Sequence, residues 1–174
     1  MDNYAQELFE AQNTLRTNPK YYVPYLKKIV KSFKGKRSHM PGRPILVTKE
    51  GAKAVNEAID FLNKQKPMHA LTYSDLLSKA SQDHADDIEA NGFTGHKGSD
   101  GSTMSDRIER YCAWSGKIGE NLAYSNIYDG GHEFVLNLLV DDGVKTRGHR
   151  KNIFNPKFYC VGIGLAKNQT YTYT

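Results

Sequence analysis

The sequence is poor in cysteine and contains no long apolar run. Only two cysteines occur among 174 residues, at positions 112 and 160. Their number and separation exclude both a dense disulfide framework and the paired spacing of a zinc ribbon. We expect Cys112 and Cys160 to be reduced and buried, with one disulfide between them as the alternative. No apolar stretch approaches the roughly 20 residues that a membrane-spanning helix requires.

The N-terminus lacks the basic and apolar regions of a secretory signal peptide, since residues 1–7 read MDNYAQE. If Met1 is the native start, we expect an intracellular, cytoplasmic protein; a secreted mature form with an added methionine is the alternative. The length and a hydrophobic content of 39% predict one globular domain over residues 1–174.

Acidic residues are absent between Ala11 and Lys49, where ten lysines and arginines occur. We interpret residues 11–49 as a basic helical segment followed by a loop. The charges form either a solvated face or a surface that docks on an acidic protein or an anionic membrane. Nucleic acid is disfavoured as a partner because no base-reading motif accompanies the charge. The predicted docking residues are Lys27, Lys28, Lys31, Lys34, Lys36 and Arg37.

The spacing of apolar residues predicts mostly helices, with a few short strands. Together they indicate an α+β fold in which helices flank a small, mainly antiparallel sheet. Ser74 is expected to cap one helix and Gly92 to end it. The predicted helices span 2–16, 19–33, 50–65, 74–91, 103–112 and 133–140, and the predicted strands span 45–47, 159–166 and 170–174.

Three short runs in the second half set imidazoles and a carboxylate against glycine. Glycine allows positive φ and close backbone approach, so it is common where a loop directs a side chain inward. We therefore expect His96, Glu120 and His149 to face one polar cleft, as metal binding or acid–base chemistry would require. The runs are GHKG at 95–98, GENLA at 119–123 and RGHRKN at 147–152.

The order of these runs, with an apolar helix before the third and a final VGIGLA strand, resembles the CAP superfamily. This family comprises the cysteine-rich secretory proteins, insect venom antigens and pathogenesis-related plant proteins. The resemblance extends to F-x-x-x-N-x-x-R-x-N-P at 9–19 and HADD at 84–87, and so covers nearly the whole chain. It implies an α-β-α sandwich with a three- or four-stranded antiparallel sheet between helical layers.

The resemblance also implies a cavity lined by two histidines and two acidic residues. His96, Glu120 and His149 match three of these positions. The fourth, a glutamate in the family, falls on Asp141 or Asp142, and we favour Asp142. Such a set suits Zn²⁺, with His96, Glu120 and His149 as the metal ligands; a hydrogen-bonded histidine–glutamate network without metal is the alternative. His84, Arg150 and Asn152 are expected to be structural.

Three functions remain open, and whether the chain is an enzyme is undecided. The favoured one is a non-catalytic binding or scaffold module whose cavity takes a protein, lipid or sterol ligand. The second is a structural subunit that docks on a larger assembly through its basic segment. The third is a metal-dependent hydrolase, a peptidase. A serine hydrolase using Ser99, Ser102 or Ser105 beside His96 lacks a nucleophile elbow.

Overall fold

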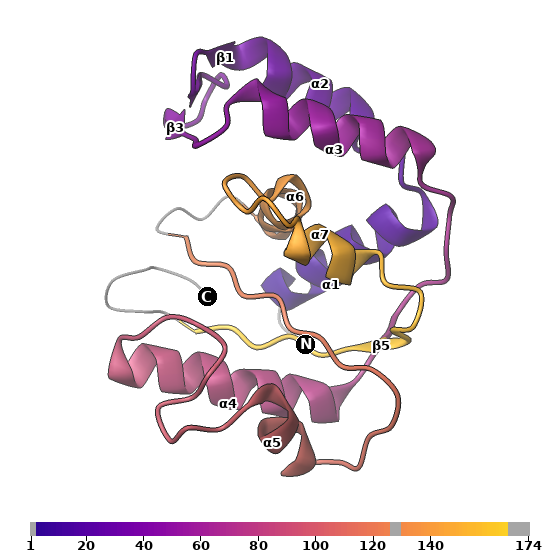
Figure 1. Ribbon diagram of the computed structural model, residues 1–174, viewed down its shortest axis with the longest axis vertical. Coiled ribbons are helices and arrows are strands. Elements are labelled where there is room, and N and C mark those ends of the chain that lie inside the picture. The colour runs from indigo at the N-terminus through magenta and orange to yellow at the C-terminus, as the bar shows by residue number, and fades with distance from the viewer. Residues whose placement is uncertain (1–2, 126–129, 167–174) are drawn as a thin grey trace.

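Helices dominate the computed structural model, which describes residues 3–125 and 130–166 (Figure 1). The α+β fold class predicted from the sequence is confirmed. The helices are α1 (Asn3–Thr17), α2 (Val23–Ser32), α3 (Ala52–Lys64), α4 (Asp75–Asn91), α5 (Met104–Glu109), α6 (Gly131–Val140) and α7 (Gly148–Ile153). The strands are β1 (Phe33–Lys34), β2 (Arg37–Ser38), β3 (Leu46–Val47), β4 (Thr72–Tyr73) and β5 (Cys160–Val161).

Local sequence signals explain where several helices begin and end. The side chain of Ser74 accepts a hydrogen bond from the Leu77 amide at the start of α4, and Gly92 ends that helix with φ of 65°. Thr103 and Asp106 form a reciprocal capping box at the start of α5. Pro24 lies in the first turn of α2, where its missing N–H costs nothing. Helix α2 therefore begins at Val23 rather than at position 19.

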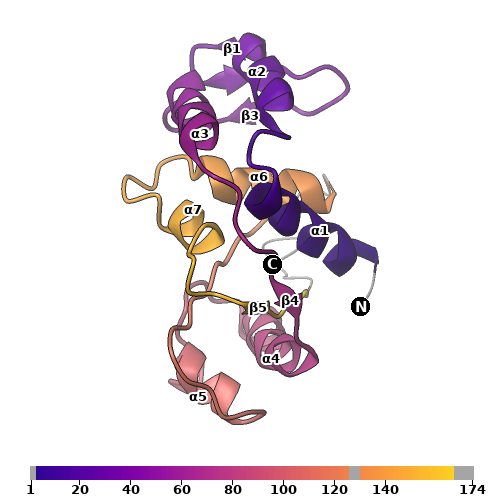
Figure 2. The ribbon, with the colours of Figure 1, turned by 90° about the vertical axis from the view of Figure 1, so that its right-hand side faces the viewer.

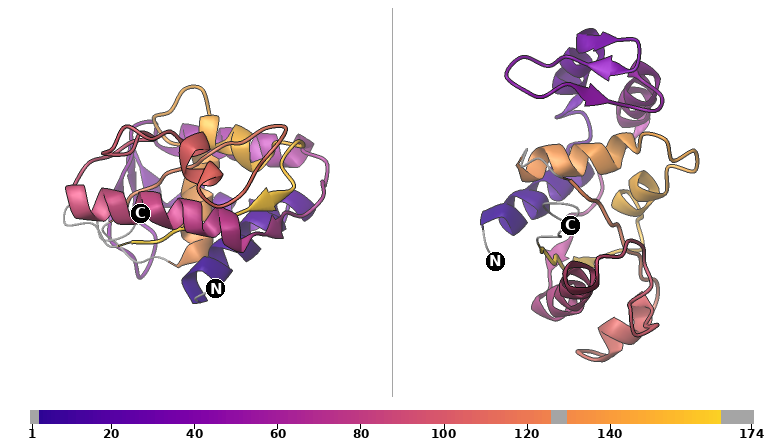
Figure 3. Two further views of the ribbon diagram at one scale, coloured as in Figure 1. Left: turned by 90° about the horizontal axis from the view of Figure 1, so that it is seen from below. Right: turned by 90° about the vertical axis from the view of Figure 1, so that its left-hand side faces the viewer.

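The helices form three groups along the molecule (Figures 1 and 2). Helices α2 and α3 lie at one end with β1, β2 and β3, while α1, α6 and α7 occupy the middle. Helices α4 and α5 lie at the other end, and the chain around β4 and β5 passes between them and the middle group, as Figure 3 also shows.

The strands are arranged differently from the single antiparallel layer implied by the resemblance. Strands β1, β2 and β3 form an antiparallel sheet beside α2 and α3, whereas β4 and β5 pair in parallel between the helical groups. Only residues 160–161 of the predicted strand at 159–166 form a ladder. The predicted strand at 170–174 lies outside the described residues.

Buried aliphatic side chains from five helices form the core. Leu15, Leu26, Leu62 and Leu139 are fully buried in α1, α2, α3 and α6, and Ile153 of α7 joins them. No helix in the described part of the chain is long and apolar enough to cross a membrane.

Two polar residues of the N-terminal motif in α1 hold backbone segments together instead of lining a site. Arg16 is fully buried and donates to the carbonyl oxygens of Ile153, Asn155 and Phe158. Asn13 bonds both the amide and the carbonyl of Leu71. These bonds hold together the two segments that lead into β4 and β5, so the N-terminal motif has a structural explanation.

Both cysteines are free thiols. The absence of a disulfide between Cys112 and Cys160 agrees with the favoured expectation. Their predicted burial is wrong for Cys160, which is exposed, and Cys112 is only half-buried. The cause is that β5 pairs with β4 but leaves the Cys160 side chain on an uncovered face.

Candidate functional site

The first histidine pair joins the loop after α4 to the GENLA run. His96 Nδ1 lies 2.7 Å from Glu120 Oε1, and Arg107 of α5 donates to Glu120 Oε2 at 2.7 Å. The Arg107 side chain is only 3% exposed, and it also donates to the His96 carbonyl oxygen. Both carboxylate oxygens of Glu120 therefore have partners, and the buried guanidinium fixes the carboxylate in place.

The second histidine pair joins the end of α6 to the start of α7. His149 Nδ1 lies 2.7 Å from Asp141 Oδ1, and the His149 backbone N–H donates to Asp141 Oδ2 at 3.0 Å. Asp141 is buried and has φ of 57°, a left-handed conformation that ends α6. This conformation points the carboxylate toward the first turn of α7.

Two asparagines connect the pairs. Asn121 donates to the His149 carbonyl oxygen at 3.4 Å, while Asn152 donates to the Glu120 carbonyl oxygen at 3.2 Å. Asn152 also donates to the Asn121 side chain at 2.9 Å. The GENLA run thus lies along α7, and all three glycine-flanked runs meet at one place. We refer to His96, Glu120, Asp141 and His149 as the histidine–acid seam.

Gly119 allows the GENLA run to approach this closely. A Cβ atom at position 119 would lie 2.7 Å from Phe158 Cζ and 3.3 Å from Asn152 Oδ1. A side chain there would push the run away from α7. The glycine beside Glu120 therefore serves the close backbone approach expected from the sequence.

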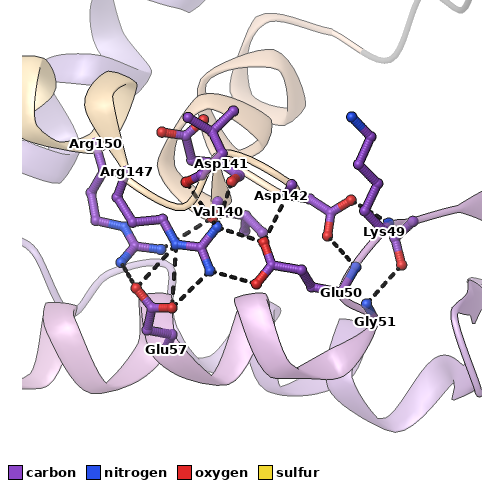
Figure 4. A network of polar contacts seen from close by, with 12 residues as sticks. Lys49, Glu50, Gly51, Glu57, Val140, Asp141, Asp142, Arg147 and Arg150 are labelled. Atoms are coloured by element: carbon purple, nitrogen blue, oxygen red, sulfur yellow. Dashed lines mark hydrogen bonds and ion pairs between the residues drawn. The ribbon is translucent and has the colours of Figure 1, made fainter.

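Asp142, the favoured fourth residue of the predicted cavity, points elsewhere. Its carboxylate accepts from the backbone amides of Lys49 at 2.6 Å and Glu50 at 2.8 Å, ahead of α3 (Figure 4). The aspartate that bonds a histidine is its neighbour, Asp141. The neighbouring carboxylates thus bond different elements, Asp141 the start of α7 and Asp142 the segment before α3. The spacing of residues along α6 does not predict which of the two faces a histidine.

The donor groups that the seam leaves for a ligand are the two imidazole Nε2 atoms. Neither forms a hydrogen bond within residues 3–125 and 130–166, while each Nδ1 faces a carboxylate. Metal-bound histidines commonly have such a carboxylate partner on the other ring nitrogen. Imidazoles oriented in this way, here by Glu120 and Asp141, are a type of donor that Zn²⁺ accepts.

The predicted ligand set His96, Glu120 and His149 is not preassembled. In the part of the chain that the structure describes, no group of three or more histidine, cysteine, aspartate or glutamate side chains is placed to hold a metal ion. Glu120 would have to leave Arg107 or His96 to become a ligand. Zinc binding stays a prediction, and two protein ligands would bind the ion more weakly than a four-ligand structural site.

A network of charged groups reaches the backbone of Asp141, one of the seam residues (Figure 4). Arg147, in a left-handed conformation with φ of 52°, donates to Glu50 and Glu57 of the α3 region and to the Asp141 carbonyl oxygen. Hydrogen bonds from Arg147 lower the pKa of both Glu50 and Glu57 to about 2. Arg150 is buried and donates to Leu139 O and Glu57, which confirms its expected structural role.

The serines near His96 are engaged elsewhere. The hydroxyl of Ser99 donates to Asp87 at 2.5 Å, and that of Ser105 donates to Glu109 at 2.9 Å. The Ser102 backbone amide donates to Asp100 at 2.8 Å, and a side-chain hydrogen bond from Ser102 helps to lower the pKa of Asp100. No serine–histidine–glutamate triad is therefore formed around His96 by these three residues.

His84 has the structural role expected of it. It is buried in α4, and its Nε2 lies 2.8 Å from the Gly95 carbonyl oxygen, so it fixes the loop immediately before His96. Arg107, by contrast, was missed. Its helix is short and polar, and only the contact with Glu120, 13 positions away, distinguishes it from a surface arginine.

The six predicted docking residues lie together on α2, β1 and β2 and the turn between the strands. All six are exposed, and none forms an ion pair with a residue that the structure describes. Cavities lie away from the seam: one of about 350 Å³ is lined by Tyr21, Tyr22 and Tyr25 among others. Another, of about 550 Å³, is lined by Tyr73, Gln82 and Leu165 among others.

Comparison with known proteins gives one match. No curated protein and no solved structure matches the chain. The model of the CAP family, described as the cysteine-rich secretory protein family, matches residues 9–174, a region that contains every residue of the seam. Because that match spans nearly the whole chain, the protein belongs to the CAP (cysteine-rich secretory protein) family.

Proposed function

We propose that this chain is a non-catalytic binding domain, and that the imidazoles of His96 and His149 are its ligand-facing groups in the seam. Membership of the CAP family favours a binding or scaffold domain in general. The ligand class that we infer is a protein, lipid or sterol surface, with Zn²⁺ as an accessory ion held by the two Nε2 atoms.

The observation that carries this proposal is that both carboxylates are committed to the fold. Protonating Glu120 would weaken its charge-assisted bond to Arg107 and leave a nearly buried guanidinium without its negatively charged partner. Both carboxylate oxygens of Asp141 similarly form hydrogen bonds with His149. A peptidase would need a free general base beside the metal-bound water, and neither carboxylate is free to act as one.

A zinc titration tests the imidazoles as ligands. We expect calorimetry to detect one Zn²⁺ per wild-type chain, with affinity reduced at least about tenfold in His96→Ala and in His149→Ala. His132→Ala is the control, because His132 is exposed on α6 and lies outside the seam. Unchanged affinity in both seam variants would show that any bound zinc is held elsewhere.

A turnover assay separates the binding domain from the peptidase. We expect no cleavage of a mixed peptide library by the zinc-loaded protein. Cleavage that stops on chelation, resumes with zinc and is lost in both histidine variants would overturn the proposal in favour of the metal-dependent hydrolase.

A further inference from the structure

The end of the molecule that carries β1, β2 and β3 exposes three consecutive aliphatic side chains. Ile45, Leu46 and Val47 are 56%, 52% and 69% exposed. Successive residues of a strand point to opposite faces, so neither face of β3 is covered. Strand β3 is also the edge of its sheet, in the order β1-β2-β3. An uncovered aliphatic edge strand favours association with an apolar partner.

Positive charge lies directly beside this aliphatic run. Arg37 of β2 pairs with Val47, and Lys36 in the preceding turn accepts two hydrogen bonds from Thr48 through its carbonyl oxygen. Lys34 of β1 faces Arg37 across the sheet. We define the basic–aliphatic tip as Lys34, Lys36, Arg37, Ile45, Leu46 and Val47.

The tip is a preformed part of the fold. It lies at the end of the long axis opposite α5 (Figure 1). Ser38 of β2 is buried and bonds Ser32 of α2 through their hydroxyls at 2.8 Å, and the His39 amide donates to the Ser32 carbonyl. The sheet is thus held against α2, and α2 in turn packs on α3.

The chemistry of the tip selects among anionic partners. Lysines and arginine attract any of them, but the aliphatic run also needs an apolar phase within a few ångströms of the negative charge. A bilayer supplies both, because anionic headgroups lie directly over acyl chains. Proteins that bind single-stranded nucleic acid contact the phosphates with basic side chains and stack the bases on aromatic side chains, and the tip has no aromatic side chain.

We propose that the basic–aliphatic tip docks this domain on anionic bilayers. Lys34, Lys36 and Arg37 contact the headgroups, while Ile45, Leu46 and Val47 insert at the boundary with the acyl chains. The docking involves no seam residue, and it does not depend on zinc or on the ligand proposed for the seam.

Vesicle co-sedimentation tests the charge contribution. The probes are phosphatidylcholine vesicles with and without about one-third phosphatidylserine, at about 0.1 M salt. We expect binding only to the anionic vesicles, and a loss of about 100-fold when the three tip cations become glutamine. The tip variant is Lys34→Gln/Lys36→Gln/Arg37→Gln, and the matched control with the same change in net charge is Lys117→Gln/Lys151→Gln/Lys157→Gln.

The aliphatic contribution is tested by a second variant, Ile45→Ser/Leu46→Ser/Val47→Ser. We expect it to bind anionic vesicles about tenfold or more weakly than wild type, while Leu76→Ser/Val144→Ser, which removes exposed aliphatic groups elsewhere, binds normally. Since the replaced side chains are exposed, all variants should melt within about 2 °C of wild type.

Insertion has its own readout. Trp114 is the single tryptophan, so Leu46→Trp in a Trp114→Phe background reports from the tip alone. Its emission should shift to the blue with anionic vesicles and not with neutral ones. No binding by wild type at low salt, or equal losses in tip and control glutamine variants, would overturn the proposal. A serine variant that binds as well as wild type would also overturn it. That result would show that the aliphatic side chains contribute nothing and that charge alone attracts the tip, so an acidic protein would fit equally well.

Discussion

Replacing Arg147 by alanine is expected to destabilise the protein by about 3 kcal/mol. The Arg147 side chain is 9% exposed and lies between α3, the end of α6 and the start of α7. It donates to Glu50 at 2.7 and 2.8 Å, to Glu57 at 2.8 Å and to the Asp141 carbonyl oxygen at 2.7 Å. Alanine would remove every one of these bonds.

The magnitude follows from the burial of the partners. Leaving the carbonyl oxygen of buried Asp141 without this donor costs about 1–3 kcal/mol. Breaking a fully buried ion pair costs about 3–5 kcal/mol, but the side chains of Glu50 and Glu57 are 23% and 44% exposed and can recover part of their hydration. With the ion-pair contribution reduced for this exposure, the total is about 3 kcal/mol, which corresponds to a Tm lower by about 6–12 °C in a domain of this size.

Thermal melting followed by circular dichroism measures this change. Arg110→Ala is the matched control, because Arg110 bonds Asp83 and Asp100 at a more exposed place and its loss should lower Tm much less. A fall in Tm below about 3 °C for Arg147→Ala, or one equal to that of the control, would refute the reasoning.

The same network predicts a dependence of stability on pH. The folded pKa of Glu50 and of Glu57 is about 2, below the usual 4.5, chiefly because Arg147 bonds both carboxylates. The unfolded chain therefore binds more protons between pH 4.5 and 2, and stability falls as pH falls through this window. Urea unfolding should show a smaller difference between wild type and Arg147→Ala at about pH 2.5 than at pH 7. A difference independent of pH would contradict the role given to the carboxylates.

Two further substitutions test the close approaches and caps that place the seam. Gly162→Ala should cost about 3 kcal/mol or more, because the added Cβ would lie 2.2 Å from the Leu77 carbonyl carbon in α4. Gly148→Ala is the control and should cost under about 1 kcal/mol, because its Cβ would lie 3.7 Å from the nearest atom. Equal melting points for the two variants would refute the packing argument. Ser74→Ala should cost about 1 kcal/mol through loss of the α4 N-cap, measured by urea unfolding, whereas Ser74→Asn should restore most of it.

The sequence predicted best those elements whose signals are local. The helix at 74–91 is confirmed at both ends, since Ser74 and Gly92 act through bonds and dihedral angles within one or two turns. Helix α7 was missed because its six residues contain only one buried aliphatic, Ile153, and no apolar period. The sequence pattern predicts a helix end and a loop where the β1–β2 hairpin lies, because two-residue strands carry too little alternation to recognise.

The candidate site was predictable as a set of runs but not as a set of contacts. Glycine next to His96, Glu120 and His149 correctly indicated a close approach of three segments, although the third is the start of α7 and not a loop, and hydrogen bonds join the three. The partner of His149 depends on a left-handed turn at Asp141, which only the packing of α6 against α7 determines. The exposure of Ile45, Leu46 and Val47 likewise depends on sheet order: the strand was predicted, but its place at the edge was not.

The position of the two carboxylates decides how variants of the seam should be read. Glu120→Gln would weaken the bond to buried Arg107, and Asp141→Asn would disturb the joint between α6 and α7, so each would perturb the fold as well as any chemistry. Loss of ligand binding in these variants therefore does not identify a general base or a ligand. The histidines are different, because their Nε2 atoms bond no described residue, and their backbone carbonyl oxygens would keep the bonds from Arg107 and Asn121 after substitution. Only substitutions of His96 and His149 therefore test ligand binding by the seam without disturbing the backbone contacts that hold the seam together.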